Sequence, residues 1–130
     1  MILDTSFIID FMDGDPKAVE KMNLLQDKRE NIFVTSPTIF ELWSGIARSK
    51  RPENEMKKVI EVIKAQLCLD LDQETAQQAG TIDGMLVHEG IQIDTEDCMI
   101  AGIAKKHNQT VLTRNIKHFG RIKDLKIETY

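Results

Sequence analysis

The strongest constraint on the fold is an alternation of short apolar runs with longer stretches of helical periodicity. Apolar and β-branched runs typical of strands occupy residues 1–3, 32–34, 67–69, 111–113 and, more weakly, 125–127. Helical stretches lie between them at residues 5–12, 17–28, 36–46, 53–64, 73–88 and 94–107. Strands that alternate with helices in this way imply right-handed parallel crossovers. We therefore predict an α/β fold, a three-layer α/β/α sandwich on a small parallel sheet.

The helix over residues 36–46 is predicted from both its start and its periodicity. Ser36 followed by Pro37 indicates an N-cap residue and a proline at the first helical position. Its inward residues recur at helical spacing: Ile39, Leu42, Trp43 and Ile46. In the next helix, the residues expected to point inward are Met56, Val59, Ile60 and Ile63.

Length and composition indicate one domain that includes residues 1–130. The chain is 42% hydrophobic and 29% charged, which is enough apolar material for a core and unlike a disordered segment. Its longest nearly unbroken apolar run, residues 99–104, is far shorter than the roughly 20 residues that cross a bilayer. The first residues have neither the basic leader nor the long apolar region of a signal peptide. We expect a cytoplasmic protein that does not enter a membrane.

The charges are unevenly distributed, although the net charge is only −4. Residues 66–104 contain no Lys or Arg, whereas residues 105–126 are rich in both and contain a single acidic residue, Asp124. Such a pattern fits a cation site flanked by a polyanion-binding rim, and it fits two differently solvated faces equally well. The charge pattern leaves both interpretations open.

Cysteine and histidine do not point to a site. Cys68 and Cys98 lie far apart and outside any CxxC motif, so buried small hydrophobes are expected rather than a disulfide or a zinc site. The three histidines lack the spacing of a metal-binding motif, and surface or boundary positions are expected for them: His88, His107 and His118.

Four polar residues follow the predicted strands in a way that brings them to one edge of the sheet. Asp4 ends the first strand, and Asn115 lies two residues beyond the strand over residues 111–113. Glu41 lies one turn into the helix after the second strand, with the small Gly45 four residues on, so that another group can approach closely. Asp97 lies in the first turn of the helix over residues 94–107. Sites in open parallel sheets form at the carboxyl ends of strands.

Each of the four residues also has a structural explanation. Asp4 could cap the first helix, and Asp97 could complete a capping box begun by Asp94. Glu41 could be a solvated helix residue, and Asn115 could be a turn residue. These explanations do not account for the convergence of all four residues. Carboxylates that converge without a base repel one another, and a hard divalent cation is the usual resolution.

Four ordered motifs that cover residues 1–128 resemble those of PIN-domain ribonucleases, in particular the VapC-like toxins of toxin–antitoxin pairs. The motifs are Asp4-Thr5-Ser6, Glu41-Leu42-x-x-Gly45, Ile93-x-x-x-Asp97-x-x-Ile100-Ala101-x-x-Ala104 and Thr113-Arg114-Asn115-x-x-His118-Phe119. The resemblance implies Mg²⁺ or Mn²⁺ held by Asp4 and Asp97, with Glu41 completing the acidic cluster. The fourth family position is often Asp, whereas this chain has Asn115, so a second metal ion is not implied, although Asp94 could add charge.

The resemblance also implies an activity and partners. The implied reaction is the hydrolysis of RNA phosphodiester bonds, and the implied partners are a small antitoxin protein and a second copy of the chain. Thr5, Ser6 and Thr113 are expected to support the carboxylates. The residues expected to contact phosphate are Arg114, Lys117 and Arg121. With only 5% aromatic residues, the site is expected to read the backbone of single-stranded or looped RNA.

Two other functions remain as alternatives. A receiver-like phosphorylation switch matches the length and the α/β order, but it needs a second acid after the first strand and a Lys after the fifth. A catalytically degenerate PIN-like scaffold is compatible with Asn115, but Asp4, Glu41 and Asp97 argue against it. Phe40 and Trp43 could contact an antitoxin, although core packing is expected for Trp43.

Overall fold

A computed structural model describes residues 1–130 and contains one five-stranded parallel sheet with the strand order β3-β2-β1-β4-β5. The strands are β1 (Ile2–Leu3), β2 (Phe33–Thr35), β3 (Leu67–Leu69), β4 (Val111–Leu112) and β5 (Ile127–Glu128). The bounds of the first four agree with the predicted runs to within one residue, and β5 begins two residues later than predicted.

Seven helices connect the strands. They are α1 (Thr5–Met12), α2 (Pro16–Asp27), α3 (Ser36–Arg48), α4 (Pro52–Ile63), α5 (Gln73–His88), α6 (Thr95–Lys106) and α7 (Ile116–Phe119). The sequence predicts the first six. It does not predict α7, because a helix of four residues is too short to show a periodicity. None of the seven is long and apolar enough to cross a membrane.

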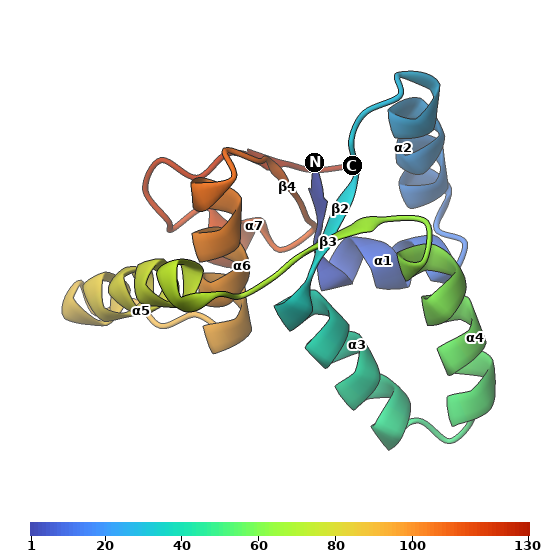
Figure 1. Ribbon diagram of the computed structural model, residues 1–130, viewed down its shortest axis with the longest axis horizontal. Coiled ribbons are helices and arrows are strands. Elements are labelled where there is room, and N and C mark those ends of the chain that lie inside the picture. Colours follow the sequence, from blue (N-terminus) through green and yellow to red (C-terminus); the bar gives the residue numbers. More distant parts are fainter.

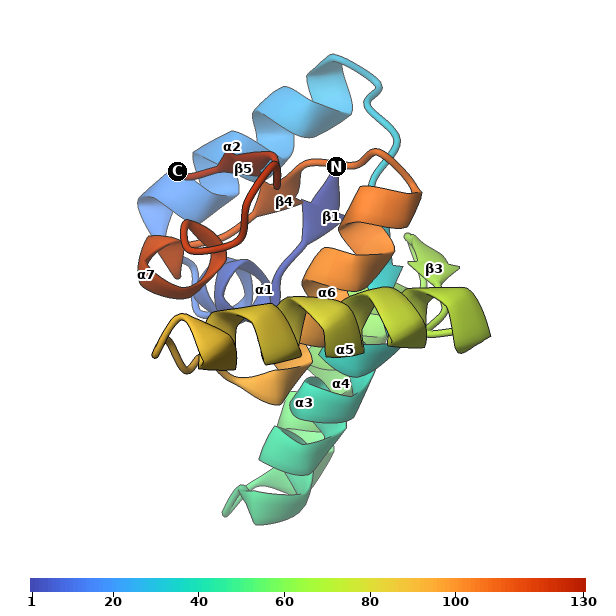
Figure 2. The ribbon, with the colours of Figure 1, turned by 90° about the vertical axis from the view of Figure 1, so that its left-hand side faces the viewer.

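Successive residues of the central strands point to opposite faces of the sheet and enter two separate cores. Ile2 and Val111 pack in the core covered by α5, α6 and α7. Leu3 and Leu112 pack in the core covered by α1, α2, α3 and α4. Figure 1 shows these two groups of helices on the two sides of the sheet, and Figure 2 shows α5 and α6 in front of it. The predicted three-layer sandwich is confirmed.

The strand order places a topological switch point between β1 and β4. From β1 the chain continues to β2 and β3 on one side, whereas β4 is followed by β5 on the other. Leu3 pairs with Leu112, so the segments that begin at Asp4 and Thr113 leave the sheet side by side. Ligands of open α/β sheets bind at such a point. The order also differs from the 2-1-3-4-5 order of receiver-like folds, which disfavours the phosphorylation switch.

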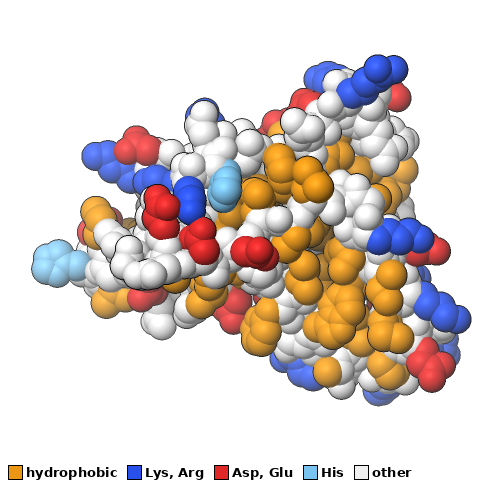
Figure 3. Space-filling view, viewed as in Figure 1, with side chains coloured by type: hydrophobic (Ala, Val, Ile, Leu, Met, Phe, Trp, Pro, Cys, Tyr) orange, Lys and Arg blue, Asp and Glu red, His pale blue; other side chains and the backbone are white.

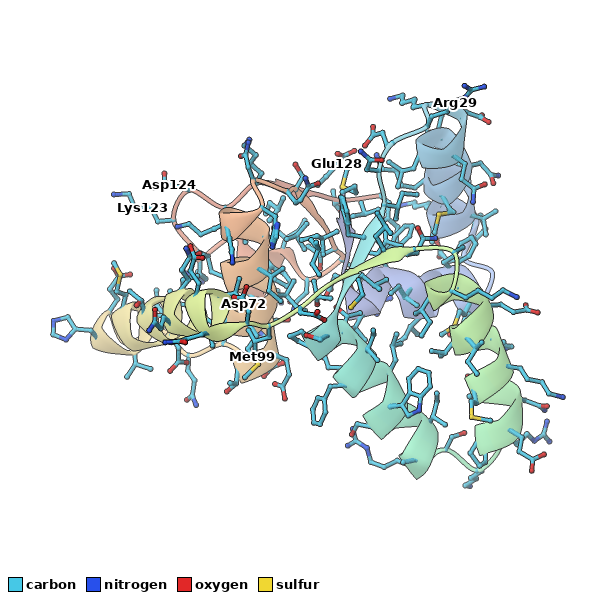
Figure 4. All side chains as sticks on the ribbon, viewed as in Figure 1. Arg29, Asp72, Met99, Lys123, Asp124 and Glu128 are labelled. Carbon is cyan, nitrogen blue, oxygen red and sulfur yellow. The ribbon has the colours of Figure 1, made fainter.

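Helix α6 is fixed against α5 by a close backbone approach. A Cβ atom at Gly102 would lie 2.7 Å from the Thr75 carbonyl oxygen and 2.9 Å from the Ala79 nitrogen, so only glycine fits there. Lys106 Nζ donates to Asp72 Oδ2 at 2.7 Å, and Figure 4 shows Asp72 at the start of α5, beside α6. These contacts fix the helix that carries Asp97.

The structure corrects the expected N-cap residue of α3 and shows the surroundings of Gly45. Thr35 rather than Ser36 is the N-cap residue, because its Oγ1 accepts a hydrogen bond from the Thr38 backbone nitrogen at 3.2 Å. Ser36 is the first helical residue, and its Oγ accepts from the Leu71 backbone nitrogen at 2.9 Å. Gly45 faces open space, because no atom of the chain lies within 4 Å of a Cβ built there. The chain itself therefore makes no close approach at Gly45.

Cys98 is buried as expected, but Cys68 is exposed, because it lies on β3 at the edge of the sheet. Three apolar residues of α3 and α4 that are predicted to be inside are also exposed: Trp43, Met56 and Ile60. The reason is that α3 and α4 extend away from the sheet as neighbouring helices, as both ribbon views show (Figures 1 and 2). Leu42, Ile46 and Val59 lie on the sides of these helices that enter the core, whereas Trp43 and Ile60, each the next residue after a buried one, lie on sides that no other element of the chain covers. Figure 3 shows a broad hydrophobic surface over these two helices.

Candidate active site

Asp4 is held at the end of β1 through one of its two carboxylate oxygens. The residue is 3% exposed, and its Oδ2 accepts hydrogen bonds from Ser6 Oγ at 2.6 Å and Thr113 Oγ1 at 2.7 Å. Asp4 occupies the N-cap position of α1, but its side chain makes no capping hydrogen bond. The capping explanation for Asp4 is therefore wrong, because the carboxylate is bound by hydroxyl groups instead of the helix backbone.

The same two hydroxyl groups connect α1 to the segment that follows β4. Ser6 Oγ accepts from the Arg114 backbone nitrogen at 3.2 Å, and Thr113 Oγ1 accepts from the Asn115 backbone nitrogen at 2.8 Å. Thr113 is fully buried. Asp4, Ser6 and Thr113 thus form one hydrogen-bonded unit across the switch point.

Asp97 is also held through a single oxygen. It is 6% exposed in the first turn of α6, and its Oδ2 contacts Asn115 Nδ2 at 3.1 Å and His118 Nδ1 at 2.6 Å. Asp94 is the N-cap residue of α6 by position, yet its side chain makes no capping hydrogen bond. The capping box expected as an alternative is therefore absent, and the segment around α7 binds Asp97 instead.

His118 is a site residue that the sequence reasoning missed. It is a boundary residue, as expected, but its imidazole contacts Asp97 and lies 3.8 Å from the exposed Asp94 carboxylate. The sequence spacing could have indicated this contact, because His118 lies three residues after Asn115. Once the short helix α7 forms, this spacing brings both side chains near Asp97.

Glu41 is half-buried on α3 and accepts a hydrogen bond from Thr5 Oγ1 at its Oε1, at 2.7 Å. Burial raises the pKa of Glu41 to about 7; the Thr5 hydrogen bond opposes this shift, and repulsion from Asp4 and Asp97 adds to it. Burial likewise raises the pKa of Asp97 to about 6, against the His118 hydrogen bond and with repulsion from Asp4. The three carboxylates predicted from the sequence are therefore close enough to repel one another.

Each of these three carboxylates has one oxygen without a hydrogen bond: Asp4 Oδ1, Glu41 Oε2 and Asp97 Oδ1. No buried side-chain nitrogen or oxygen of the chain lacks a partner, so these oxygens are accessible to solvent. Mutually repelling carboxylates with accessible oxygens match the ligands that Mg²⁺ and Mn²⁺ prefer. The acidic cluster could therefore bind a metal ion, and possible ligand atoms of Asp94, Asp97 and His118 also lie within 4.8 Å of one another.

The basic residues predicted to contact phosphate follow Thr113 in the sequence, and their side chains are in two different states. Arg114 is 64% exposed, and its Nη1 contacts both carboxylate oxygens of Asp10 at 2.6 Å. Tyr130 also donates its hydroxyl to Asp10 at 2.6 Å, a connection that the sequence did not indicate. Lys117 and Arg121 are exposed, and neither side chain makes a hydrogen bond or an ion pair. Both are therefore available to a phosphate group.

Figure 3 shows acidic side chains gathered near the middle of the face drawn there, beside the hydrophobic surface over α3 and α4. Lys123 and Asp124, labelled in Figure 4, lie on the turn between α7 and β5, which extends away from the sheet. The basic segment thus continues beyond the residues that adjoin the site.

Comparisons with known proteins give a consistent result. Residues 1–125 match the family model of the PIN domain. A tRNA(fMet)-specific endonuclease VapC from Salmonella typhimurium is 31% identical over 130 residues, which cover 99% of this chain and 96% of the relative. A protein of the same name from Shigella flexneri is 30% identical with the same coverage.

Two solved structures are similar over nearly the whole chain. The structure of VapBC2 from Rickettsia felis, bound to a DNA fragment from its promoter, has a TM-score of 0.90 and 26% identity, covering 99% of this chain and 97% of that chain. The structure of DNA-bound VapBC from Salmonella typhimurium has a TM-score of 0.88 and 31% identity, covering 98% and 96%.

Proposed function

This chain belongs to the PIN-domain family, among the VapC ribonucleases, and from that premise we propose that it is a Mg²⁺- or Mn²⁺-dependent endoribonuclease and the toxin of a toxin–antitoxin pair. The observation that carries the proposal is the set of three repelling carboxylates at the switch point, each with one accessible free oxygen.

In this proposal Asp4 and Asp97 hold the cation through their free Oδ1 atoms. Ser6 and Thr113 fix the orientation of Asp4, and Asn115 fixes that of Asp97. When bound, a divalent cation neutralises charge at the phosphate and makes water a better nucleophile at neutral pH. The site residues supply the geometry that this chemistry needs.

Glu41 is the residue that we assign to the attacking water. Thr5 holds its Oε1, which leaves Oε2 to accept a proton from water. In the metal-free protein, burial and the neighbouring carboxylates raise the pKa of Glu41 above its ordinary value, which makes it a better proton acceptor than a solvated glutamate. Asn115 Oδ1 makes no hydrogen bond within the chain and can accept one from a second water.

The substrate that we propose is RNA with single-stranded or looped segments. Lys117 and Arg121 contact the phosphate backbone, and Arg114 joins them if phosphate competes with Asp10 for its guanidinium group. The relatives from Salmonella typhimurium and Shigella flexneri are named as specific for tRNA(fMet), which makes tRNA the first substrate to test.

We propose two protein partners, a small antitoxin and a second copy of this chain. The similar solved structures are complexes of VapB with VapC, two of them with DNA. The exposed apolar side chains of Phe40 and Trp43 are available for such a contact. A small DNA-binding protein encoded by the preceding reading frame, which copurifies with this chain, would support the antitoxin assignment.

The activity is tested with purified protein and two RNAs, a tRNA and an unstructured oligonucleotide. We expect endonucleolytic products in Mg²⁺ or Mn²⁺ and none after EDTA is added. Asp4→Asn is expected to lower the rate by several orders of magnitude, because a metal site supplies several kcal/mol of transition-state stabilisation. Asp27→Asn, at an exposed residue of α2 without a side-chain partner, is the matched control and is expected to cut normally. Cleavage that persists in EDTA would refute the metal dependence, and a folded protein that binds an antitoxin but cleaves nothing would support the scaffold alternative.

A further inference from the structure

We infer that His118 is a positioning residue for Asp97: it holds Asp97 Oδ2 through Nδ1 and thereby presents Asp97 Oδ1 to a divalent cation. The inference rests on the proposed function, since it assigns a role within the same site. His118 is one position of the fourth motif, but the resemblance assigns it no role, and its contact with Asp97 is visible only in the folded chain.

Two donors reach the same oxygen of Asp97 from one short segment. Asn115 Nδ2 lies 3.1 Å from Oδ2, and His118 Nδ1 lies 2.6 Å from it. A carboxylate that is bound by two donors at one oxygen cannot rotate freely about its terminal bond, so its other oxygen keeps a fixed direction. The contact from His118 is the shorter of the two, and a second contact to Asp94 lies at 3.8 Å.

The segment that carries His118 is itself anchored. Phe119, the next residue, is fully buried in the core beneath α6, and its backbone nitrogen donates to the Asn115 carbonyl oxygen at 3.2 Å. The Asn115 backbone nitrogen is bound in turn to Thr113 Oγ1 at 2.8 Å. The position of the imidazole is therefore set by the core and by the same hydroxyl group that orients Asp4.

The distance between Nδ1 and Oδ2 favours positioning over ligation. Two ligands that bind one Mg²⁺ at 2.0–2.1 Å and at a right angle to each other lie about 3 Å apart. Nδ1 and Oδ2 lie 2.6 Å apart, which is a hydrogen-bond distance, so these two atoms do not share one ion in this arrangement. Partners that orient a metal ligand in this way are known to affect metal affinity strongly.

The test compares three variants of the full chain. His118→Leu keeps similar volume and removes the donor. His118→Asn places an amide nitrogen near the position of Nδ1 and restores the donor. His88→Leu, at an exposed histidine at the end of α5 without a side-chain partner, is the control. For each variant we measure the Mn²⁺ and Mg²⁺ concentrations that give half of the metal-induced rise in melting temperature, and kcat and KM for RNA cleavage.

We expect His118→Leu to weaken the binding of both ions by about 10- to 100-fold and to lower kcat at subsaturating metal, with KM for RNA unchanged. His118→Asn is expected to bind both ions within about threefold of the wild-type affinity, because it restores the donor. His88→Leu is expected to match the wild type. If His118→Leu does not fold without metal, His118→Ala and the rescue by His118→Asn carry the same comparison.

Four results would overturn the inference. His118→Leu could bind both ions as the wild type does, which would make the contact structural only. His118→Asn could be as impaired as His118→Leu, or Mn²⁺ binding could fall while Mg²⁺ binding stays unchanged, and either result would show that the imidazole itself is a ligand. A wild-type protein that gains no stability from either ion would overturn the proposed function together with this inference. The other results concern only the His118 variants and would leave the proposed function intact, so the two failures can be distinguished.

Discussion

Replacing Glu41 by glutamine is expected to stabilise the metal-free protein, although it removes a site residue. The glutamine side chain can still accept the hydrogen bond from Thr5, because its amide carbonyl replaces Oε1. The substitution removes a negative charge that burial disfavours and that Asp4 and Asp97 repel. It therefore isolates the free-energy cost of holding an ionised carboxylate at this position.

The magnitude follows from the pKa. A shift of the Glu41 pKa from 4.5 to about 7 corresponds to roughly 3 kcal/mol against the ionised form. Glu41 is half-exposed, and solvent screening reduces this value, so we expect Glu41→Gln to raise the free energy of unfolding by about 1–2 kcal/mol at pH 8. For a chain of 130 residues, that is a rise in Tm of about 4–8 °C.

The pH dependence has a definite sign. A carboxyl group with a raised pKa in the folded state binds more protons there than in the unfolded state, so stability falls as the pH rises. For Glu41 this loss runs from about pH 4.5 to pH 7. Asp97, whose pKa is raised from 3.8 to about 6, adds a loss over that lower range. The difference between wild type and Glu41→Gln is expected to be largest at pH 8 and nearly absent at pH 4.5.

The assay is urea unfolding in EDTA at a series of pH values, with Glu20→Gln as the control at an exposed glutamate of α2. The control is expected to change stability by less than about 0.5 kcal/mol at every pH. A Glu41→Gln variant that is less stable than wild type at pH 8, or a gain that does not change with pH, would refute the reasoning. Either result would mean that Glu41 is an ordinary solvated residue.

Three further predictions test other parts of the molecule. Gly102→Ala is expected to lower the free energy of unfolding, measured in urea, by about 1–3 kcal/mol, because the added Cβ would overlap Thr75. Its control is Gly84→Ala, which is expected to be neutral or stabilising because the added Cβ would face open space. Asp97→Asn is expected to lose most of the rise in Tm that Mn²⁺ gives the wild type, measured by differential scanning fluorimetry. Neutral substitutions of the basic residues are expected to reduce the log–log salt slope of RNA binding by about 0.7–1 unit per contact, and an unchanged slope would assign them to the solvated surface. The residues for this titration are Arg114, Lys117 and Arg121.

Most of the fold could be predicted from the sequence because its elements have strong local signals. The apolar runs before Asp4 and Thr113 are short and bounded, and six helices have enough turns to show a periodicity. The strand order could not be predicted, because hydrophobic periodicity does not say which strands are neighbours. The exposure of Trp43 could not be predicted either, because apolar residues at helical spacing look the same in the sequence whether or not another element covers them.

The candidate site was predictable as a set of residue types and not as a set of contacts. Asp4, Glu41 and Asp97 follow from their places after strands and in first turns, together with the family motifs. The sequence could not show that hydrogen bonds reach only one oxygen of each carboxylate. It could not place His118 either, because its contact with Asp97 depends on α7, whose four residues give no periodic signal.

The cost in stability and the proposed activity have one physical origin. Burial and mutual repulsion raise the pKa of Glu41 and Asp97, which lowers the stability of the metal-free protein at neutral pH. In the proposed function, a bound cation would neutralise these charges and recover part of that stability. A ligand that binds only the folded state returns RT ln(1 + [L]/Kd), about 2.7 kcal/mol at one hundred times Kd. Stability and RNA cleavage should therefore rise over the same range of metal concentration. Two midpoints that differ by tenfold or more would show that the ion that stabilises the fold is not the ion that supports cleavage.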